Sequence, residues 1–111
     1  MVAVTVVVAA RNAAATIGRT LAALSAQQLD GEYEVIVVDS GSADGTVSLV
    51  ERAPGVALLG NPGGEPASSR NLGAAQARGE VLAFTDADCE PAVDWLACGL
   101  RALHDAEIVQ G

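Results

Sequence analysis

The stretch EVIVVDSGSADGT, residues 34–46, decides the fold. Residues 34–38 are rich in Val and Ile, which is typical of a strand buried on both faces of a parallel sheet. Asp39 ends that strand, and the Ser and Gly residues after it indicate a turn. Asp44 is suited to cap a helix that ends at about Arg52. The stretch therefore predicts a unit of strand, polar turn and helix.

The same unit recurs on both sides of this stretch. Further strands are expected over residues 2–8, 56–59, 80–85 and 107–109. Further helices are expected over residues 16–28 with Thr16 as N-cap, over 67–77, and from Pro91 onwards with Glu90 near the N-cap. Strands that alternate with helices predict a three-layer α/β/α fold with a mostly parallel, Rossmann-like sheet. We expect residues 1–111 to form a single domain.

Composition argues against several kinds of partner. The six basic residues are all Arg and face fourteen acidic residues, for a net charge of -8. Nucleic acid is therefore an unsuitable partner, because it needs clustered Lys and Arg. No apolar run approaches the roughly 18 residues of a membrane span. The apolar residues 1–10 lack the basic leading region of a signal peptide, so we expect a cytoplasmic chain, membrane-peripheral at most.

The two cysteines, Cys89 and Cys98, do not have the spacing of a metal-binding motif. We expect two free thiols, buried or half-buried, in a reducing compartment. A disulfide between them is not suggested by the pattern, but it is left open.

Polar side chains follow each strand that leads into a helix. They are Arg11 and Asn12, then Asp39, Ser40 and Ser42, then Asn61, and finally Asp86 and Asp88. Ligands of parallel sheets bind outside the carboxyl ends of the strands. These residues are therefore expected to line one shared cleft.

The sharpest candidate for chemistry is Asp86-Ala87-Asp88, directly after an apolar strand. Two carboxylates on one turn can converge on Mg²⁺ or Mn²⁺, which prefer oxygen ligands and phosphates. Such an ion would let an acidic protein bind an anionic ligand. The alternative is that Asp88 or Glu90 caps the next helix.

Two further candidates each have a structural alternative. Asp39 can accept hydrogen bonds from a base or ribose, or it can form the turn over residues 39–42. Arg70 can order nearby acids or bind phosphate, or it can form a surface ion pair.

Four blocks together resemble the family 2 glycosyltransferases of the GT-A type. The blocks are VTVVVAARN at residues 4–12, EVIVVDSGSADGT at 34–46, SSRNLGAAQARGEVLAF at 68–84, and TDAD at 85–88. Each block is weak or moderate evidence alone, but their order and spacing match the family over almost the whole chain. The resemblance implies a metal-dependent enzyme that takes sugar from a nucleoside diphosphate sugar, most often a UDP-sugar, with inversion.

The resemblance also implies roles for individual residues. The nucleotide-binding residues would be Ala10, Arg11 and Asn12 at the base and ribose, Asp39 at the base, Arg70 against the nucleotide, and Asp86 near the ribose and sugar. Asp88, together with Asp86, would bind the divalent metal, Mn²⁺ or Mg²⁺. Ala10 and Arg11 stand where the family often has Pro and an aromatic residue, so Arg11 would stack through its guanidinium instead.

The chain stops about where the acceptor half of such an enzyme begins. The resemblance therefore implies a truncated GT-A fold, the N-terminal nucleotide-sugar-binding half of a hexosyltransferase. No catalytic base is assigned, because it is expected beyond Gly111. We expect weak metal-nucleotide binding, little or no transfer to the unknown acceptor, and a bare sheet edge that could pair in a homodimer.

Two other functions remain as alternatives. One is a half-domain that binds nucleotide or a partner without catalysis. The other is a sugar nucleotidyltransferase, which would carry a Gly- and Lys-rich loop after its first strand. Residues 9–14 contain neither Gly nor Lys, which disfavours that reading.

Overall fold

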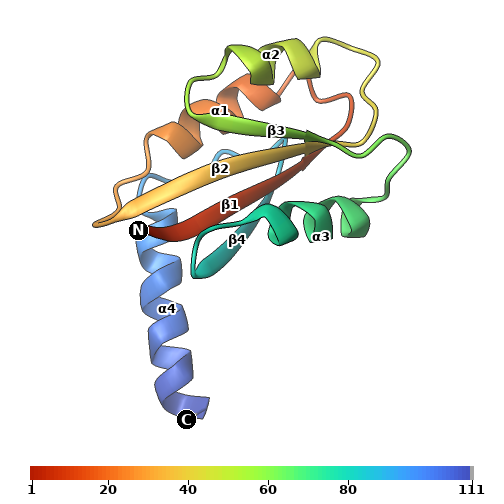
Figure 1. Ribbon diagram of the computed structural model, residues 1–111. Helices are drawn as coiled ribbons and strands as arrows, with labels where there is room; N and C mark the ends of the chain where they lie inside the picture. The colour runs from red at the N-terminus through yellow and green to blue at the C-terminus, as the bar shows by residue number, and fades with distance from the viewer. Residues whose placement is uncertain (111) are drawn as a thin grey trace.

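The chain forms one parallel sheet with helices on both faces (Figure 1). The structure is a computed structural model that describes residues 1–110, with side chains described through residue 103. The strands are β1 (Val2–Ala10), β2 (Glu32–Asp39), β3 (Val56–Gly60) and β4 (Val81–Asp86), in the order β3-β2-β1-β4. The helices are α1 (Ile17–Ser25), α2 (Thr46–Arg52), α3 (Pro66–Gln76) and α4 (Trp95–Gln110). The predicted α/β fold with a parallel, Rossmann-like sheet is confirmed.

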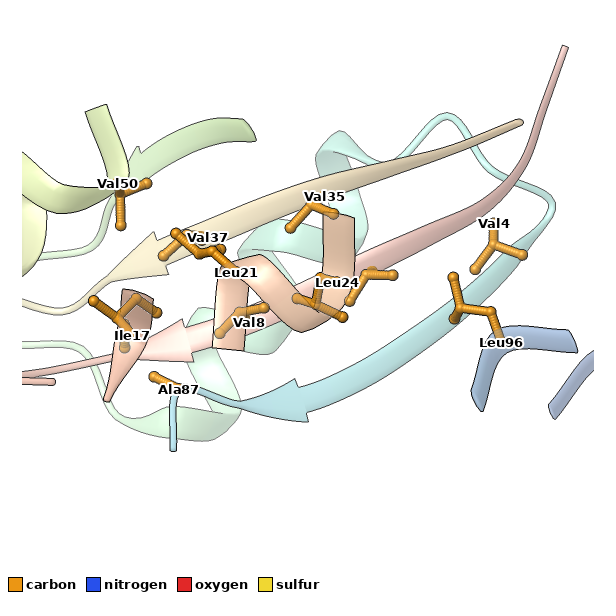
Figure 2. Close-up of a cluster of buried hydrophobic side chains, with 12 residues drawn as sticks. Val4, Val8, Ile17, Leu21, Leu24, Val35, Val37, Val50, Ala87 and Leu96 are labelled. Atoms are coloured by element: carbon orange, nitrogen blue, oxygen red, sulfur yellow. The ribbon is translucent and has the colours of Figure 1, made fainter. Parts of the chain in front are cut away.

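The sheet is the middle layer of three. Helices α1 and α2 and the start of α4 cover one face, and α3 covers the other (Figure 1). Figure 2 shows the larger core, where the apolar side of α1 meets alternate residues of β1 and β2. Val6, Val7 and Val8 of β1 are fully buried because this strand has a strand on each side and a helix on each face.

Helix α4 starts later than the sequence predicted. The prediction was a start at Pro91 with Glu90 near the N-cap, whereas the helix begins at Trp95. The side chain of Gln27 explains the shift, because its Nε2 donates to the Ala92 carbonyl at 2.7 Å and its Oε1 accepts from the Leu96 N–H at 3.0 Å. These bonds hold the backbone before Trp95 out of the helix and satisfy one free N–H of its first turn.

The predicted fifth strand over residues 107–109 is wrong. Helix α4 continues through this segment to Gln110. The sequence after Leu96 has a good set of helix formers, and its one glycine before residue 111, Gly99, does not stop the helix. A short β-branched pair is therefore too weak a signal to predict a strand at this position.

Two predicted caps also differ from the structure. Thr16 stands at the N-cap position of α1, but its side chain makes no capping bond and donates to the Ala87 carbonyl instead. The N-cap position of α2 is Gly45, and Asp44 before it accepts from the Thr46 N–H at 3.0 Å. Helix α1 ends at Ser25 instead of residue 28, which leaves Gln27 free to reach α4.

Within residues 1–110, β3 and β4 are the two edge strands. The outer edge of β4 fits the bare edge expected from the sequence, and homodimer formation through it stays a prediction. No helix over these residues is long and apolar enough to cross a membrane.

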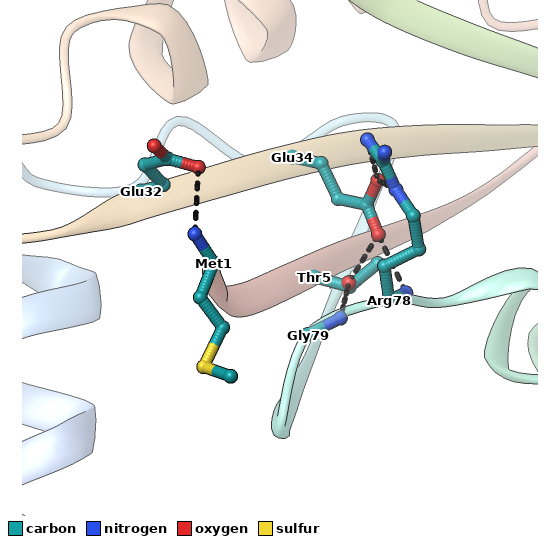
Figure 3. Close-up of polar contacts among 6 residues, drawn as sticks. All are labelled: Met1, Thr5, Glu32, Glu34, Arg78 and Gly79. Atoms are coloured by element: carbon teal, nitrogen blue, oxygen red, sulfur yellow. Dashed lines mark hydrogen bonds and ion pairs between the residues drawn. The ribbon is translucent and has the colours of Figure 1, made fainter.

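Glu34 fastens the amino-terminal side of the sheet (Figure 3). Its Oε2 accepts from the Thr5 hydroxyl at 2.6 Å and from the Arg78 backbone N–H at 2.8 Å. The Arg78 guanidinium lies 3.0 Å from Oε1, and the Gly79 N–H donates to the Thr5 hydroxyl at 2.9 Å. Burial is the largest single influence and opposes ionisation, but the hydrogen bonds from Thr5 and Arg78 together lower the pKa of Glu34.

Replacing Glu34 by Gln should lower the free energy of unfolding by about 1–3 kcal/mol at neutral pH, because a carboxylate accepts these bonds more strongly than an amide. A carboxyl group with a depressed pKa stabilises the fold above its unfolded-state pKa. That stabilisation is lost as pH falls through the lower folded-state pKa. The difference between wild type and Glu34→Gln in urea unfolding should therefore shrink below pH 4.5, the ordinary value for this group.

Glu32→Gln is the matched control for this experiment. Glu32 lies on the same strand, 3.6 Å from the amino terminus, with a side chain 71% exposed (Figure 3). An exposed pair of this kind contributes at most about 1 kcal/mol. Equal losses in the two variants across the whole pH range would contradict the anchoring role of Glu34.

Helix α3 lies close to the sheet because Gly73 faces it. A Cβ at Gly73 would lie 2.5 Å from Val7 Cγ1 and 3.2 Å from Val38 Cγ2. Gly18, on the opposite side of the molecule in α1, has open space where a Cβ would stand. The two glycines therefore occupy helices for different reasons.

Gly73→Ala should lower the free energy of unfolding by about 1–3 kcal/mol, because the added methyl overpacks the core. Gly18→Ala should raise it by up to about 1 kcal/mol, because alanine costs less entropy in a helix. Denaturant unfolding of both variants measures the contrast. If Gly73→Ala were as stabilising as Gly18→Ala, the close packing of α3 on β1 would be refuted.

Candidate functional site

The carboxyl ends of the four strands meet at one edge of the sheet. In the parallel register Ala10 pairs with Asp39, and Asp39 pairs with Gly60 on its other side. On the far side of β1, Ala9 pairs with Asp86. The polar residues that follow the strands are thereby brought to one edge of the sheet, and the expectation that they line one shared cleft stays a prediction.

The loop after β1 is tied to the loop after β2. The Asn12 N–H donates to Ser42 Oγ at 2.8 Å, and Asn12 Oδ1 accepts from the Ala43 N–H at 2.7 Å. Asn12 has a positive φ of 50°, a conformation that Asn tolerates better than most residues. Both bonds depend on that turn, so Asn12 connects the two loops as well as lining the site.

A second pair of bonds continues this connection. The Ala13 N–H donates to the Thr46 hydroxyl at 2.8 Å, and the Ala14 N–H donates to Asp44 Oδ2 at 3.1 Å. The hydrogen bond from the Thr46 side chain is the main cause that lowers the pKa of Asp44. The two loops therefore form one unit held largely by bonds between backbone amides and short side chains.

Asp39 is buried, with 7% of the residue exposed, and its carboxylate organises the turn that follows it. Its Oδ2 accepts from the N–H groups of Gly41 at 3.2 Å and Ser42 at 3.0 Å, and its Oδ1 accepts from Ser42 Oγ. The turn-forming role considered for Asp39 is thus present. Oδ2 thus accepts two bonds, whereas Oδ1 accepts one and keeps a second acceptor direction for a ligand donor.

The acidic turn after β4 is hydrogen-bonded to the start of α1 through the Ala87 carbonyl. The hydroxyls of Thr16 and Thr20 both donate to this oxygen at 2.9 Å. Thr20 is fully buried and Ala87 nearly so, whereas Asp86 and Asp88 on either side are exposed. Sequence reasoning missed Thr20, and the only available signal was a hydroxyl on the apolar stripe of α1.

The residues of this turn fit a divalent cation. One carboxylate oxygen each from Asp86 and Asp88, together with the Cys89 sulfur, lie within 4.8 Å of one another, and all three residues are exposed. Carboxylates on a solvent-facing turn are the ligands that Mg²⁺ and Mn²⁺ use beside substrate phosphates. The expectation that both thiols are buried or half-buried is wrong, because Cys89 and Cys98 are free and exposed. The turn that carries Cys89 faces solvent.

Arg70 reaches the acidic turn from α3. One of its guanidinium nitrogens lies 3.8 Å from Asp86 Oδ1, with the two side chains 43% and 64% exposed. An ion pair this long and open adds little stability. The pair matters because it keeps a positive charge beside the Asp86 carboxylate.

A cavity of about 360 Å³ lies between the loop after β1 and the acidic turn. Its lining includes four of the predicted site residues, namely Arg11, Asn12, Asp86 and Asp88. Asp39 and Arg70 stand outside this lining. Ala10 is 3% exposed, and its carbonyl accepts from the Ser40 N–H at 3.0 Å. This bond joins the end of β1 to the turn after β2.

Asn61 joins the edge from β3, although it was not among the predicted nucleotide-binding residues. Its N–H donates to the Asp39 carbonyl at 2.7 Å, and its side-chain amide donates to the hydroxyls of Ser68 and Ser69 at 3.1 and 3.2 Å. Asn61 thereby links the strand that ends in Asp39 to the start of α3, which carries Arg70.

Comparison with known proteins gives a consistent picture. Residues 5–111 match the family model described as glycosyl transferase family 2. Glycosyltransferase AglE of Haloferax volcanii is 33% identical over 106 residues, which cover 90% of this chain and 35% of AglE.

Two solved structures have a similar fold. TarS of Staphylococcus aureus, in complex with UDP-GlcNAc, has a TM-score of 0.81 and 28% identity over 93% of this chain and 31% of its own. Mannosyltransferase PcManGT from Pyrobaculum calidifontis, in complex with GDP-Man and Mn²⁺, has a TM-score of 0.78 and 36% identity over 85% and 30%. The chain spans about a third of the length of each of these relatives.

The link between the two loops can be tested at Ser42. Ser42→Ala removes the acceptor of the Asn12 N–H and a donor to Asp39. We expect hydrogen exchange at the Asn12 amide to accelerate about fivefold or more, since one lost hydrogen bond is worth about 1 kcal/mol. Ser48→Ala, at an exposed position on α2, is the control. Unchanged exchange at Asn12 in the Ser42 variant would show that the loops are not coupled through this hydroxyl.

Proposed function

The chain belongs to glycosyl transferase family 2, and on that basis we propose that it binds the sugar donor of an inverting glycosyltransferase. The donor is a nucleoside diphosphate sugar, and we take it to be a UDP-hexose derivative. The alignment of Ala10, Asp39, Gly60 and Asp86 at one sheet edge carries the proposal. Ligands of parallel sheets bind at this edge.

We assign the base and ribose to the two connected loops. Asp39 has acceptor capacity left for an N–H of the base, and the Arg11 guanidinium is exposed and planar, which suits stacking. Ala10 and Asn12 would lie beside the base and ribose, since the Ala10 carbonyl and the Asn12 side chain are both bonded to the loop after β2. Because the loops are already bonded to each other, little ordering is needed when the nucleotide arrives.

We assign the diphosphate to the acidic turn through a divalent cation, Mn²⁺ or Mg²⁺. The ligands would be Asp88 and Asp86, and Arg70 would add a positive charge at the same place. When bound, the cation neutralises the charge of the departing nucleoside diphosphate. The complex of the related PcManGT with GDP-Man and Mn²⁺ supports this assignment.

The acceptor and the general base belong, in this proposal, to the part of the relatives that the chain does not span. The matched region is 35% of AglE and 30% of PcManGT. Inverting transfer needs a base beside the acceptor hydroxyl. Residues 1–111 alone should therefore bind the donor without transferring its sugar.

We place this domain in a reducing compartment, the cytoplasm, because its two exposed thiols stay reduced there.

The donor site is tested by calorimetric titration of UDP into the protein with and without Mn²⁺. We expect binding that depends on Mn²⁺ and that falls at least about tenfold in Asp88→Ala, because a lost carboxylate ligand weakens the ion. Asp30→Asn, an exposed acid at the other end of the sheet, is the control and should bind as wild type does.

Each outcome has a defined meaning. Binding that is equal with and without Mn²⁺ would refute the cation-bridged diphosphate. Absence of UDP binding, when GDP or dTDP binds in the same way, would change the nucleotide and keep the site. Loss of binding in Asp30→Asn as large as that in Asp88→Ala would indicate a general charge effect.

A further inference from the structure

We propose that Cys89 is a third protein ligand of the cation, so that the site has two oxygens and one sulfur. This inference rests on the metal site proposed above. Nothing in the spacing of the two cysteines suggested it, because the ligands come from one short turn and from two different residue types. Its consequence is a shift in metal preference, away from Mg²⁺ and toward softer divalent cations.

The geometry of the turn carries the proposal. The sulfur and the two carboxylate oxygens lie within 4.8 Å of one another. An oxygen and a sulfur bound to one ion are about 3 Å apart when they are neighbouring ligands and about 4.4 Å apart when they are opposite, since metal–oxygen bonds are about 2.1 Å and metal–sulfur bonds about 2.3 Å. The three exposed side chains therefore have to rotate toward one another to hold a single ion, and nothing buried restrains them.

The Cys89 sulfur lies beside the second acid of the turn. The Cys89 N–H donates to the Asp86 carbonyl at 3.2 Å, and the Cys89 sulfur lies 3.8 Å from Asp88 Oδ1. The Ala87 carbonyl between the acids is fixed by Thr16 and Thr20. The turn is therefore constrained before an ion binds, which favours a defined ligand set.

The second cysteine provides a natural comparison. Cys98 is also free and exposed, and its sulfur lies 3.5 Å from one carboxylate, that of Asp94. It belongs to no group of three ligand residues within the part of the chain whose side chains are described. Cys89 differs from it by having two carboxylates in reach instead of one.

The donor set decides which ions fit. Mg²⁺ prefers oxygen ligands alone, whereas thiolate sulfur favours softer ions such as Zn²⁺, Co²⁺ and Cd²⁺. When the sulfur binds, the thiol releases its proton to water. A site with two carboxylates and one thiolate should therefore bind Co²⁺ and Cd²⁺ more tightly than its carboxylates alone would.

The first test is the absorption spectrum of the protein titrated with Co²⁺. A sulfur-to-cobalt charge-transfer band should appear in wild type and in Cys98→Ser, and it should be absent in Cys89→Ser. Calorimetry should show that Cys89→Ser loses about tenfold or more in Cd²⁺ affinity while its Mg²⁺ affinity changes by less than about twofold. A band of equal strength in all three proteins would overturn the proposal.

The second test measures protection of the two thiols from iodoacetamide by peptide mass spectrometry. At a free Cd²⁺ concentration ten times the dissociation constant, alkylation of Cys89 should slow about tenfold, because only the unbound fraction reacts. Alkylation of Cys98 should be unchanged. Equal protection of both thiols, or protection of Cys89 that survives in Asp88→Ala, would argue against a shared site.

The two proposals fail in different ways. If Mn²⁺ binds and depends on Asp88 but the cobalt band is missing, the sulfur ligand is refuted and the donor site stands. If neither Mn²⁺ nor Co²⁺ binds in a manner that depends on Asp88, both proposals are wrong.

Discussion

The central strand β1 is the constraint on which the rest of the structure depends. It hydrogen-bonds to β2 on one side and β4 on the other, and it has helices above and below. Parallel pairing on both sides brings Asp39 and Asp86 to opposite sides of the same two residues, Ala9 and Ala10. A one-residue slip in either ladder would move a carboxylate along the edge and turn its side chain to the other face. The strand register that packs the valines in the core is therefore the same register that places the acids at the edge.

Most of the fold could be predicted from local pattern. The β-branched runs before Asp39 and Asp86 identify buried parallel strands, and the alternation of strand and helix leaves few topologies. The errors lie where a long-range contact overrides local signals. Pro91 predicted a helix start, but the side chain of Gln27 bonds to the backbone on both sides of Trp95, and the helix begins only at Trp95. A short β-branched pair near the end of the chain is not enough to make a strand when helix formers surround it.

The candidate site shows the same division. The residue types and their places after strands predicted which side chains would gather at the edge, and four of them line one cavity. What holds them in place could not be predicted, because those bonds join distant parts of the chain. Thr20 reaches the carbonyl of Ala87, and Ser42 reaches the amide of Asn12. Such bonds leave no periodic signal, since a buried threonine in a helix resembles any other small core residue.

The pairing of β1 with β4 also has a consequence for the order of synthesis. Val4 and Val81 are neighbours in the sheet although most of the chain lies between them. At about 5–20 residues per second, a ribosome needs several seconds after β1 emerges before β4 is available. During that interval one edge of a strongly apolar strand has no partner, and such edges recruit other chains. Productive folding thus competes with association while the nascent chain is still tethered, and slower translation over the middle of the message would lengthen that exposure.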